Sequence, residues 1–181
     1  MKYSRTVILK DGRTCLLRNG TVRDGQAVLD IFKLTHAQTD WLLSMPDECG
    51  MTAEQEARFL QDKANSPNGI EIVAEVDGRI AGSAGIDSIG AKTKIRHRAD
   101  FGISVDRAYW GLGIGRALTR ACIECAREAG YAQLELEVVA DNASALALYR
   151  SEGFVEYGRN PRGFLSPLTG WQTLVLMRLE M

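Results

Sequence analysis

The chain has 181 residues, of which 45% are hydrophobic and 25% charged, and its formal net charge is −1. This composition is typical of a globular protein, and the length suits a single domain, which we place over residues 1–181. A near-neutral charge gives no electrostatic basis for binding nucleic acid or an anionic membrane, so we expect neither as a partner.

No apolar run approaches the roughly 20 residues that a membrane-spanning helix needs. The stretch from Met1 to Lys10 carries charges without a long apolar core, so we expect no signal peptide. The four cysteines, at positions 15, 49, 122 and 125, show no spacing typical of a disulfide framework. We therefore expect reduced thiols and a cytoplasmic location.

The first half of the chain predicts one strand and two capped helices. Thr14–Arg18 has the pattern of a short strand, and the capping-box pair in Thr21–Asp24 precedes apolar residues at helical spacing. A second capping box, Thr52–Gln55, begins a helix that extends to about Ala64. The segment Trp41–Gly50 between the helices is expected to be irregular.

From Ile70 onward the apolar period becomes that of strands. Ile70–Val76 and Arg79–Ile86 flank Asp77-Gly78, a strong signal for a two-residue hairpin. The order of elements predicts a mixed α/β protein with a hairpin-rich first half. Further strands are expected at Arg98–Val105, Leu134–Val139, Phe154–Tyr157 and Trp171–Leu179, and helices from a glycine-rich turn to Ala129 and over Ala143–Glu152.

Three glycines at alternate positions, Gly111, Gly113 and Gly115, lie between a predicted strand and the following helix. Glycine lets the backbone turn tightly and approach a ligand closely. The first turn of the helix offers unpaired N–H groups and the positive end of the helix dipole, so the turn predicts an anion site suited to a pyrophosphate. Arg116 and Arg120 would add positive charge to this site.

Two other interpretations of the turn remain open. The glycines could serve only a tight connection from strand to helix. A dinucleotide site is the second alternative, but its G-x-G-x-x-G pattern fails because Arg116 or Leu118 occupies the third glycine position. Glu137, at the end of the next strand, would suit a ribose-binding acid, so the dinucleotide interpretation is weakened rather than removed.

A second motif, Asp141–Tyr149, follows a strand of alternating Leu and Glu. Asn142 and Tyr149 are separated by about two helical turns, so both lie on one face of the predicted helix. A tyrosine hydroxyl there can donate a proton to a leaving group, and an asparagine can orient a ligand chain. The structural alternative is an asparagine near the helix N-cap and a half-buried tyrosine.

Together the two motifs resemble the signature of the GNAT N-acetyltransferase superfamily, Q/R-x-x-G-x-G/A followed by N-x-x-A-x-x-L-Y-x-x-x-G-F. Gly113 and Gly115 fill the glycine positions, whereas Trp110 stands where Gln or Arg is usual. The second part matches at Asn142, Ala145, Leu148, Tyr149, Gly153 and Phe154. The remaining order of strands and helices is compatible with this family over nearly the whole chain.

The resemblance implies a mixed, mostly antiparallel central sheet flanked by helices and splayed between the fourth and fifth strands. It also implies acetyl-CoA as the cosubstrate, wedged between Arg98–Val105 and Leu134–Val139, and no metal. The pyrophosphate would lie on the backbone amides of the glycine-rich turn, and the pantetheine arm would run along the first of these strands. The implied cofactor-binding residues are Ile103, Val105, Gly111, Gly113, Gly115, Arg116, Asn142 and Tyr149.

The same resemblance implies direct attack of an amine on the thioester, without an acyl-enzyme. The backbone N–H of Val105 would support the oxyanion and Tyr149 would be the general acid for the departing thiolate, so these are the expected catalytic residues. A lysine-like amine, with a pKa of about 10.4, is almost entirely protonated at pH 7, so its deprotonation matters. The candidate bases, acting directly or through water, are Asp100, Glu137, Glu75 and His97.

Other polar features have simpler explanations. Cys122 and Cys125 have the spacing of a metal or redox pair, but they fall at core positions of a predicted helix and lack a second pair, so packing explains them better. The segments Trp41–Met51 and Pro161–Gly170 flank the expected acceptor side. They either shape an amine pocket or only connect elements.

We therefore expect a cytoplasmic N-acetyltransferase that moves an acetyl group from acetyl-CoA to a primary amine. The sequence does not specify the acceptor, which is a small molecule or a peptide, and it is compatible with a homodimer. A non-catalytic acyl-CoA-binding module on the same fold is the alternative function, and a nucleotide-dependent oxidoreductase is a third.

Overall fold

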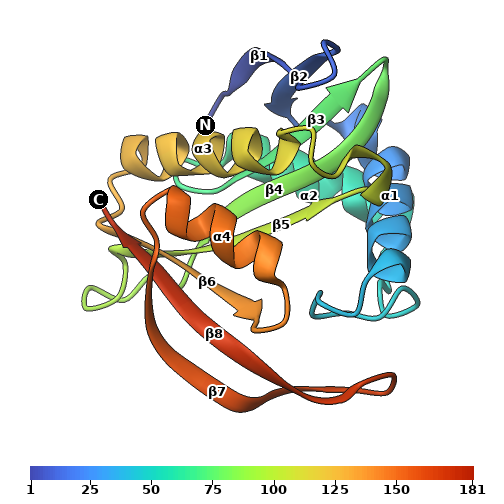
Figure 1. Ribbon diagram of the computed structural model, residues 1–181. Helices are drawn as coiled ribbons and strands as arrows, with labels where there is room; N and C mark the ends of the chain where they lie inside the picture. The colour runs from blue at the N-terminus through green and yellow to red at the C-terminus, as the bar shows by residue number, and fades with distance from the viewer.

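In the computed structural model, which describes all residues from Met1 to Met181, a single eight-stranded sheet includes both ends of the chain (Figure 1). Its order is β1-β2-β3-β4-β5-β6-β8-β7, and every neighbouring pair is antiparallel except β5 and β6. The strands are β1 (Ser4–Ile8), β2 (Thr14–Asn19), β3 (Ile70–Val76), β4 (Arg79–Ser88), β5 (Arg98–Val105), β6 (Gln133–Val139), β7 (Val155–Ser166) and β8 (Gly170–Glu180).

The helices are α1 (Gly25–Gln38), α2 (Ala53–Asn65), α3 (Ile114–Glu128) and α4 (Ala143–Ser151), with short 3-10 turns η1 (Val22–Asp24) and η2 (Arg107–Tyr109). None of them has the length and apolar character of a membrane span. The predicted mixed α/β fold, a mostly antiparallel sheet flanked by helices, is confirmed.

Helices cover both faces of the sheet. α3 and α4 lie on one face, and α1 and α2 pack on the other (Figure 1). β3 shows why two layers form, because successive side chains of a strand point to opposite faces. Ile70 and Ile72 join the large core beneath α3, whereas Val73 joins Val28 and Leu60 beneath α1 and α2. The sheet is thus held between two apolar layers.

Local sequence signals lie where they were predicted. At the start of α2, the Thr52 side chain accepts a hydrogen bond from the Gln55 N–H (3.3 Å), and the Gln55 side chain accepts one from the Thr52 N–H (2.8 Å). Asp77 and Gly78 both have positive φ, 51° and 74°, as a type I′ hairpin between β3 and β4 requires. The Thr21–Asp24 capping box is present too, but it leads into η1 before α1 begins.

β5 and β6 pair over only a short stretch. Their parallel ladder joins Arg98–Asp100 to Gln133–Glu135 and ends there. Beyond it, β5 continues along β4 to Val105, while β6 follows β8 to Val139, so the two halves of the sheet diverge. The predicted splay is therefore present, although these strands are the fifth and sixth because an unexpected strand precedes them.

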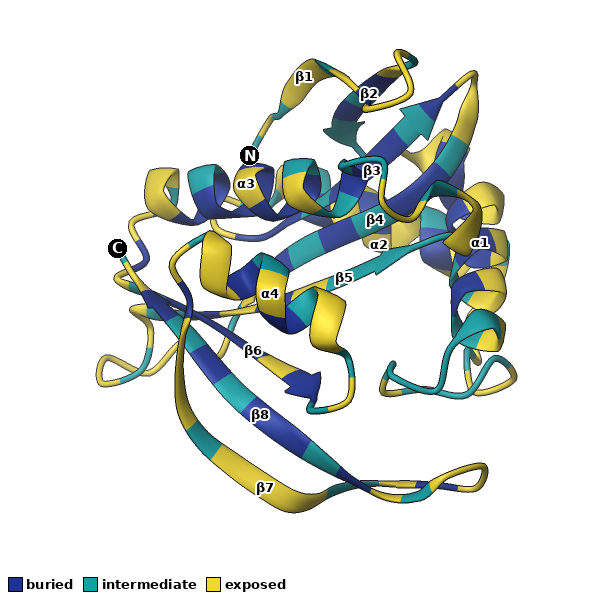
Figure 2. Cartoon of the chain, in the orientation of Figure 1, coloured by how far each residue is buried: buried dark blue, intermediate teal, exposed yellow.

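Two strand predictions were wrong. β1, at Ser4–Ile8, was missed because it is a mostly exposed edge strand with no apolar alternation. β7 continues to Ser166 instead of ending at Tyr157, so it includes part of the segment expected to be a loop. β7 is the opposite edge strand and is exposed along most of its length (Figure 2). An edge strand tolerates Pro161 and polar side chains, so this segment lacks the apolar alternation that predicts a strand.

Candidate active site

A cleft of about 540 Å³ opens where β5 and β6 diverge. Its walls come from the second half of β5, the glycine-rich turn, the start of α3, one face of α4, and the end of α1 with the residues after it. All eight residues expected at the site line it: Ile103, Val105, Gly111, Gly113, Gly115, Arg116, Asn142 and Tyr149. The two sequence motifs therefore contribute to one cavity.

The inner edge of β5 presents backbone groups to this cleft. The Asp106 N–H donates to the Ala81 carbonyl (2.9 Å). Because an antiparallel strand bonds to a given neighbour at every second residue, the even-numbered residues of β5 face β4. Ile103 and Val105 therefore direct their N–H and C=O groups toward the diverging β6. The Trp110 indole N–H donates to the Val105 carbonyl (2.7 Å), which agrees with this direction and leaves the Val105 N–H facing the cleft.

The glycine-rich turn presents further N–H groups. Gly111 and Gly113 have φ of 77° and 104°, a region that favours glycine, and Gly113 is the N-cap of α3. The first helical hydrogen bond of α3 joins the Ala117 N–H to the Gly113 carbonyl (3.0 Å), so the N–H groups before it have no helical partner. Gly115 lies within the first turn, where a Cβ would stand 3.5 Å from Leu148. The turn thus presents several backbone N–H groups that have no helical partner.

Tyr149 and Asn142 occupy the α4 wall. Tyr149 is 7% exposed, and its ring packs edge-on against Phe101 (6.1 Å between centroids) and beside Phe154 (5.8 Å). Burial raises the pKa of the Tyr149 phenol well above its usual range. The Asn142 Oδ1 accepts a hydrogen bond from the Ala145 N–H (3.2 Å) and caps α4. Both side chains therefore have structural roles and also line the cleft.

Residues 35–154 match the model of the acetyltransferase (GNAT) family. The chain belongs to the GNAT family. The matched range includes every residue that lines the cleft except Lys10. The resemblance inferred from the two motifs is confirmed.

Three curated relatives show how far this GNAT chain corresponds to known proteins. The N-alpha-acetyltransferase RimI of Mycobacterium tuberculosis is 40% identical over 97 residues, which are 54% of this chain and 59% of the relative. The L-amino acid N-acetyltransferase AaaT of Escherichia coli K12 is 31% identical over 143 residues, which are 77% of this chain and 82% of the relative. An uncharacterized protein of Mycobacterium leprae is 35% identical over 122 residues, which are 67% of this chain but only 32% of its own length. The chain therefore spans less than two thirds of the length of two of these relatives, the M. tuberculosis and M. leprae proteins.

Solved structures share the fold over nearly the whole GNAT chain. A GNAT-family acetyltransferase from Streptococcus pneumoniae aligns with a TM-score of 0.88 and 28% identity, covering 92% of this chain and 99% of that one. The putative acetyltransferase yncA from Salmonella typhimurium, solved with its cofactor acetyl-CoA, aligns with a TM-score of 0.79 and 21% identity, covering 91% and 92%. At the latter identity the likeness shows the fold alone.

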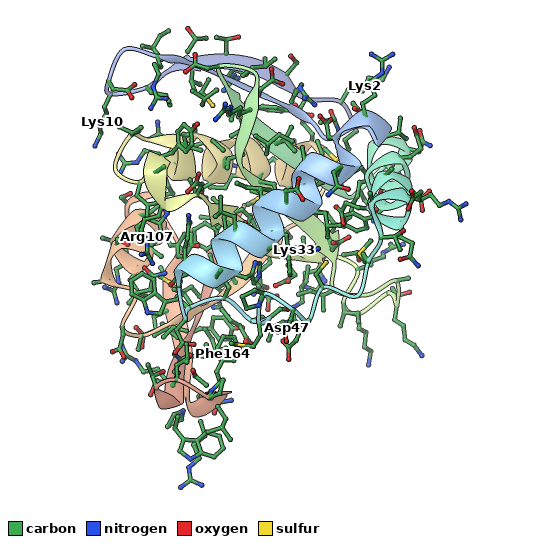
Figure 3. All side chains as sticks on the ribbon, turned by 90° about the vertical axis from the view of Figure 1, so that its right-hand side faces the viewer. Lys2, Lys10, Lys33, Asp47, Arg107 and Phe164 are labelled. Atoms are coloured by element: carbon green, nitrogen blue, oxygen red, sulfur yellow. The ribbon has the colours of Figure 1, made fainter.

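The charged side chains of the GNAT cleft are Lys10 and Arg116. Lys10 lies in the turn between β1 and β2, on the same side of the molecule as Arg107 in Figure 3. Its N–H donates to the Leu112 carbonyl (3.1 Å), which fixes that turn against the glycine-rich one. Lys10 was not predicted as a site residue, and no sequence signal indicated it because β1 itself was missed.

Arg116 and Arg120 were expected to add charge to the anion site. In the structure both contact the same carboxylate, because Glu152 lies 3.3 Å from Arg116 and 2.8 Å from Arg120. Arg120 does not line the cleft. These two arginines therefore link α3 to the end of α4, and only Arg116 also lines the cleft.

None of the four candidate bases lines the cleft. Glu75 forms an ion pair with Arg18 (2.8 Å). The other three are exposed at positions outside the cleft: Asp100, Glu137 and His97. The lining residues thus include no carboxylate and no imidazole.

The remaining predictions concern the acceptor side and the cysteines. Trp41 and Leu42 line the cleft, so the segment after α1 does shape it. The hairpin end of β7 and β8 does not line it, although Ser166 donates a hydrogen bond to Asp40 (2.7 Å). Cys122 and Cys125 lie on α3 and are buried in the hydrophobic core, as packing predicts. Burial raises the pKa of the Cys125 thiol to about 12.

Proposed function

We propose that this GNAT protein transfers the acetyl group of acetyl-CoA to a primary amine by direct attack of the amine on the thioester. One observation carries the proposal: the unpaired edge of β5, the N–H groups at the start of α3 and the phenol of Tyr149 meet in one cleft. The family match supports acetyl-CoA as the cosubstrate, and a protein of the same fold was solved with it.

The phosphate end would hold the diphosphate on backbone amides. The residues that we assign to it are Gly111, Gly113, Gly115 and Arg116, whose N–H groups gather at the positive end of the α3 dipole. The Lys10 ammonium adds a cation at the same end. The pantetheine arm would pair with Ile103 and Val105 as an extra strand. The Asn142 Nδ2 donates to no protein group, so it remains for the ligand chain.

Two groups would serve the chemical step. The Val105 N–H, directed into the cleft, would support the oxyanion, and a single donor of this kind typically contributes about 3–4 kcal/mol. Tyr149 would donate the proton of its hydroxyl to the departing thiolate. Because burial raises the pKa of this phenol, it stays protonated at neutral pH and acts as a hydrogen-bond donor more readily than as a strong acid.

The test is acetyl-CoA turnover across a panel of primary amines, measured as released thiol, with wild type and Tyr149→Phe. We expect the variant to bind acetyl-CoA like wild type but to turn over about 10²–10⁴ times more slowly. Tyr131→Phe is the matched control, because Tyr131 is a buried tyrosine outside the cleft whose hydroxyl bonds to the Asn68 carbonyl (2.9 Å).

Two outcomes would overturn parts of the proposal. Unchanged turnover in Tyr149→Phe would remove the acid assignment. Tight acetyl-CoA binding by wild type without thiol release for any amine would favour the non-catalytic acyl-CoA-binding module instead.

The acceptor class draws on the names of two relatives. One is called an N-alpha-acetyltransferase and another an L-amino acid N-acetyltransferase. We propose that the acceptor group here is likewise an α-amine. We also propose that residues 1–181 act as one domain, because β1 and β8 belong to the same sheet, and that the protein works in the cytoplasm, where its four free cysteines would stay reduced.

A further inference from the structure

Two tryptophans line the cleft: Trp41, in the segment after α1, and Trp110, which directly precedes the glycine-rich turn. The rings of Trp41 and Trp110 stack with their centroids 6.3 Å apart and an interplanar angle of 13°. Trp110 is fixed in place because its indole N–H bonds to the Val105 carbonyl, and the Arg107 guanidinium lies 5.4 Å from its ring centroid. Trp110 is nevertheless 43% exposed. The pair therefore offers an ordered apolar surface that the protein itself leaves uncovered.

Polar contacts hold the two segments that carry these tryptophans. The Gln38 amide donates to the Asp106 carboxylate (2.8 Å), which fixes the end of α1 against the segment that leaves β5. The Asp40 carboxylate accepts hydrogen bonds from Ser166 (2.7 Å) and Thr169 (2.6 Å) of the β7–β8 hairpin. Both carboxylates nearest the tryptophans in sequence are thus engaged with protein donors, and neither lines the cleft.

The charge of the cleft opposes a polycationic acceptor. Its only charged lining groups, Lys10 and Arg116, are cations at the phosphate end. Beside the tryptophans, its polar side chains are hydroxyls such as those of Thr39 and Ser104. A second ammonium on the acceptor would lose water without gaining a carboxylate partner, which is costly. An apolar group would instead cover the exposed indole surface.

The lining residues also set a condition on the reacting amine. Because none of them carries a carboxylate or an imidazole, we expect the amine to enter neutral or to lose its proton to water. The adjoining pocket, which shares Thr39 and Leu42 with the cleft, includes His36 and Asp40. An α-amine with a pKa of about 7.7–8.0 is about one part in ten neutral at pH 7, whereas a lysine-like amine is about one part in 2,500. The cleft thus favours the α-amine.

We infer that the acceptor is an α-amine whose neighbouring side chain is uncharged and apolar, and that Trp41 and Trp110 bind this side chain. The inference rests on the proposed acetyl transfer and specifies its substrate class. Amino acid amides test it well, because they share one α-amine and differ only in the side chain. We expect kcat/KM for leucinamide and phenylalaninamide to exceed that for lysinamide and glutamic acid α-amide by about tenfold or more.

Variants of Trp41 test whether the two tryptophans cause the preference for apolar side chains. Trp41→Ala should lower kcat/KM for phenylalaninamide by about tenfold or more while leaving the Kd of acetyl-CoA unchanged, and Trp41→Phe should retain most of the preference. Trp171→Ala is the matched control, since Trp171 is 56% exposed and outside the cleft. A melting temperature for each variant separates a lost contact from a lost fold.

The outcomes distinguish this inference from the function beneath it. Turnover of all four amides at similar rates, or a preference that survives in Trp41→Ala, overturns the inference and leaves acetyl transfer intact. Faster turnover of lysinamide than of leucinamide also overturns it. Absence of thiol release with every amine, despite acetyl-CoA binding, overturns the proposed function itself.

Discussion

At the scale of single residues, Gly113 and Gly115 serve the same turn for different physical reasons. Gly113 has φ of 104°, which side-chain-bearing residues rarely adopt, so it is required by backbone conformation. Gly115 lies in the first turn of α3 with no positive φ, and an added Cβ would meet only Leu148 at 3.5 Å, an ordinary contact. What glycine keeps open at position 115 is therefore the cleft beside it.

Alanine at the two positions should separate stability from ligand binding. Gly113→Ala should lower the free energy of unfolding by about 1–2 kcal/mol, because the left-handed backbone is strained for alanine. Gly115→Ala should unfold no more easily than wild type, since alanine favours a helix by about 0.5–1 kcal/mol. It should, however, raise the Kd of acetyl-CoA about tenfold or more, equivalent to at least about 1.4 kcal/mol.

Denaturant unfolding and calorimetric binding measure these two effects. If Gly115→Ala bound acetyl-CoA as tightly as wild type, the diphosphate would not lie against this turn, and the assignment of the amides would be wrong.

At the scale of elements, Asp40 joins two segments that are distant in the chain. It follows α1 and accepts hydrogen bonds from the β7–β8 hairpin through Ser166, Thr169 and Gln172. Figure 3 shows the segment around Asp47 running close to the hairpin around Phe164. Because Trp41 is the next residue in the chain, its position in the cleft depends on this contact.

Removing the Asp40 carboxylate should therefore affect the acceptor more than the cosubstrate. In Asp40→Ala we expect a raised KM for the amine and faster amide hydrogen exchange after α1, with an unchanged Kd for acetyl-CoA. Hydrogen bonds to a charged group contribute about 1.5–3 kcal/mol each, and Asp40 is half-buried. Asp30→Ala is the matched control, since Asp30 is exposed on α1 and bonds only to Gln26. Equal effects on both substrates would show that Asp40 supports the fold in general.

The sequence could predict features that depend on neighbouring residues but not contacts between distant segments. The glycine-rich turn, the capping box at Thr52 and the hairpin at Asp77-Gly78 depend on neighbouring residues, and all three lie where expected. Edge strands β1 and β7 bury little, so they lack the apolar alternation that reveals a strand. Contacts such as Glu152 with its two arginines, or Asp40 with the hairpin, join distant segments and have no local signature.

At the scale of the whole molecule, a chain with a formal net charge of −1 keeps its acidic groups out of the cleft. The diverging sheet halves expose the β5 edge, and the loops around it contribute aromatic and hydroxyl groups with cations at one end. The titrating groups that could control the rate are therefore few. They are the acceptor amine itself and the ionisable lining side chains Lys10, Tyr109, Arg116 and Tyr149, of which only Tyr149 is assigned to the chemical step.

The pH profile of kcat/KM should therefore follow the acceptor. Below the pKa of the amine, the reactive neutral fraction rises tenfold with each pH unit, so the rate should rise with pH and level off near that pKa. Because burial raises the pKa of Tyr149 above its usual value of about 10, the phenol keeps its proton and no decline is expected up to about pH 10. An α-amino amide and a simple alkylamine should thus give midpoints about 2.5 units apart. Stopped assays of thiol release from pH 6 to 10 should show the rate with the α-amino amide levelling off near pH 8 while the rate with the alkylamine still rises at pH 10. A midpoint at the same pH for both amines would reveal a base on the protein.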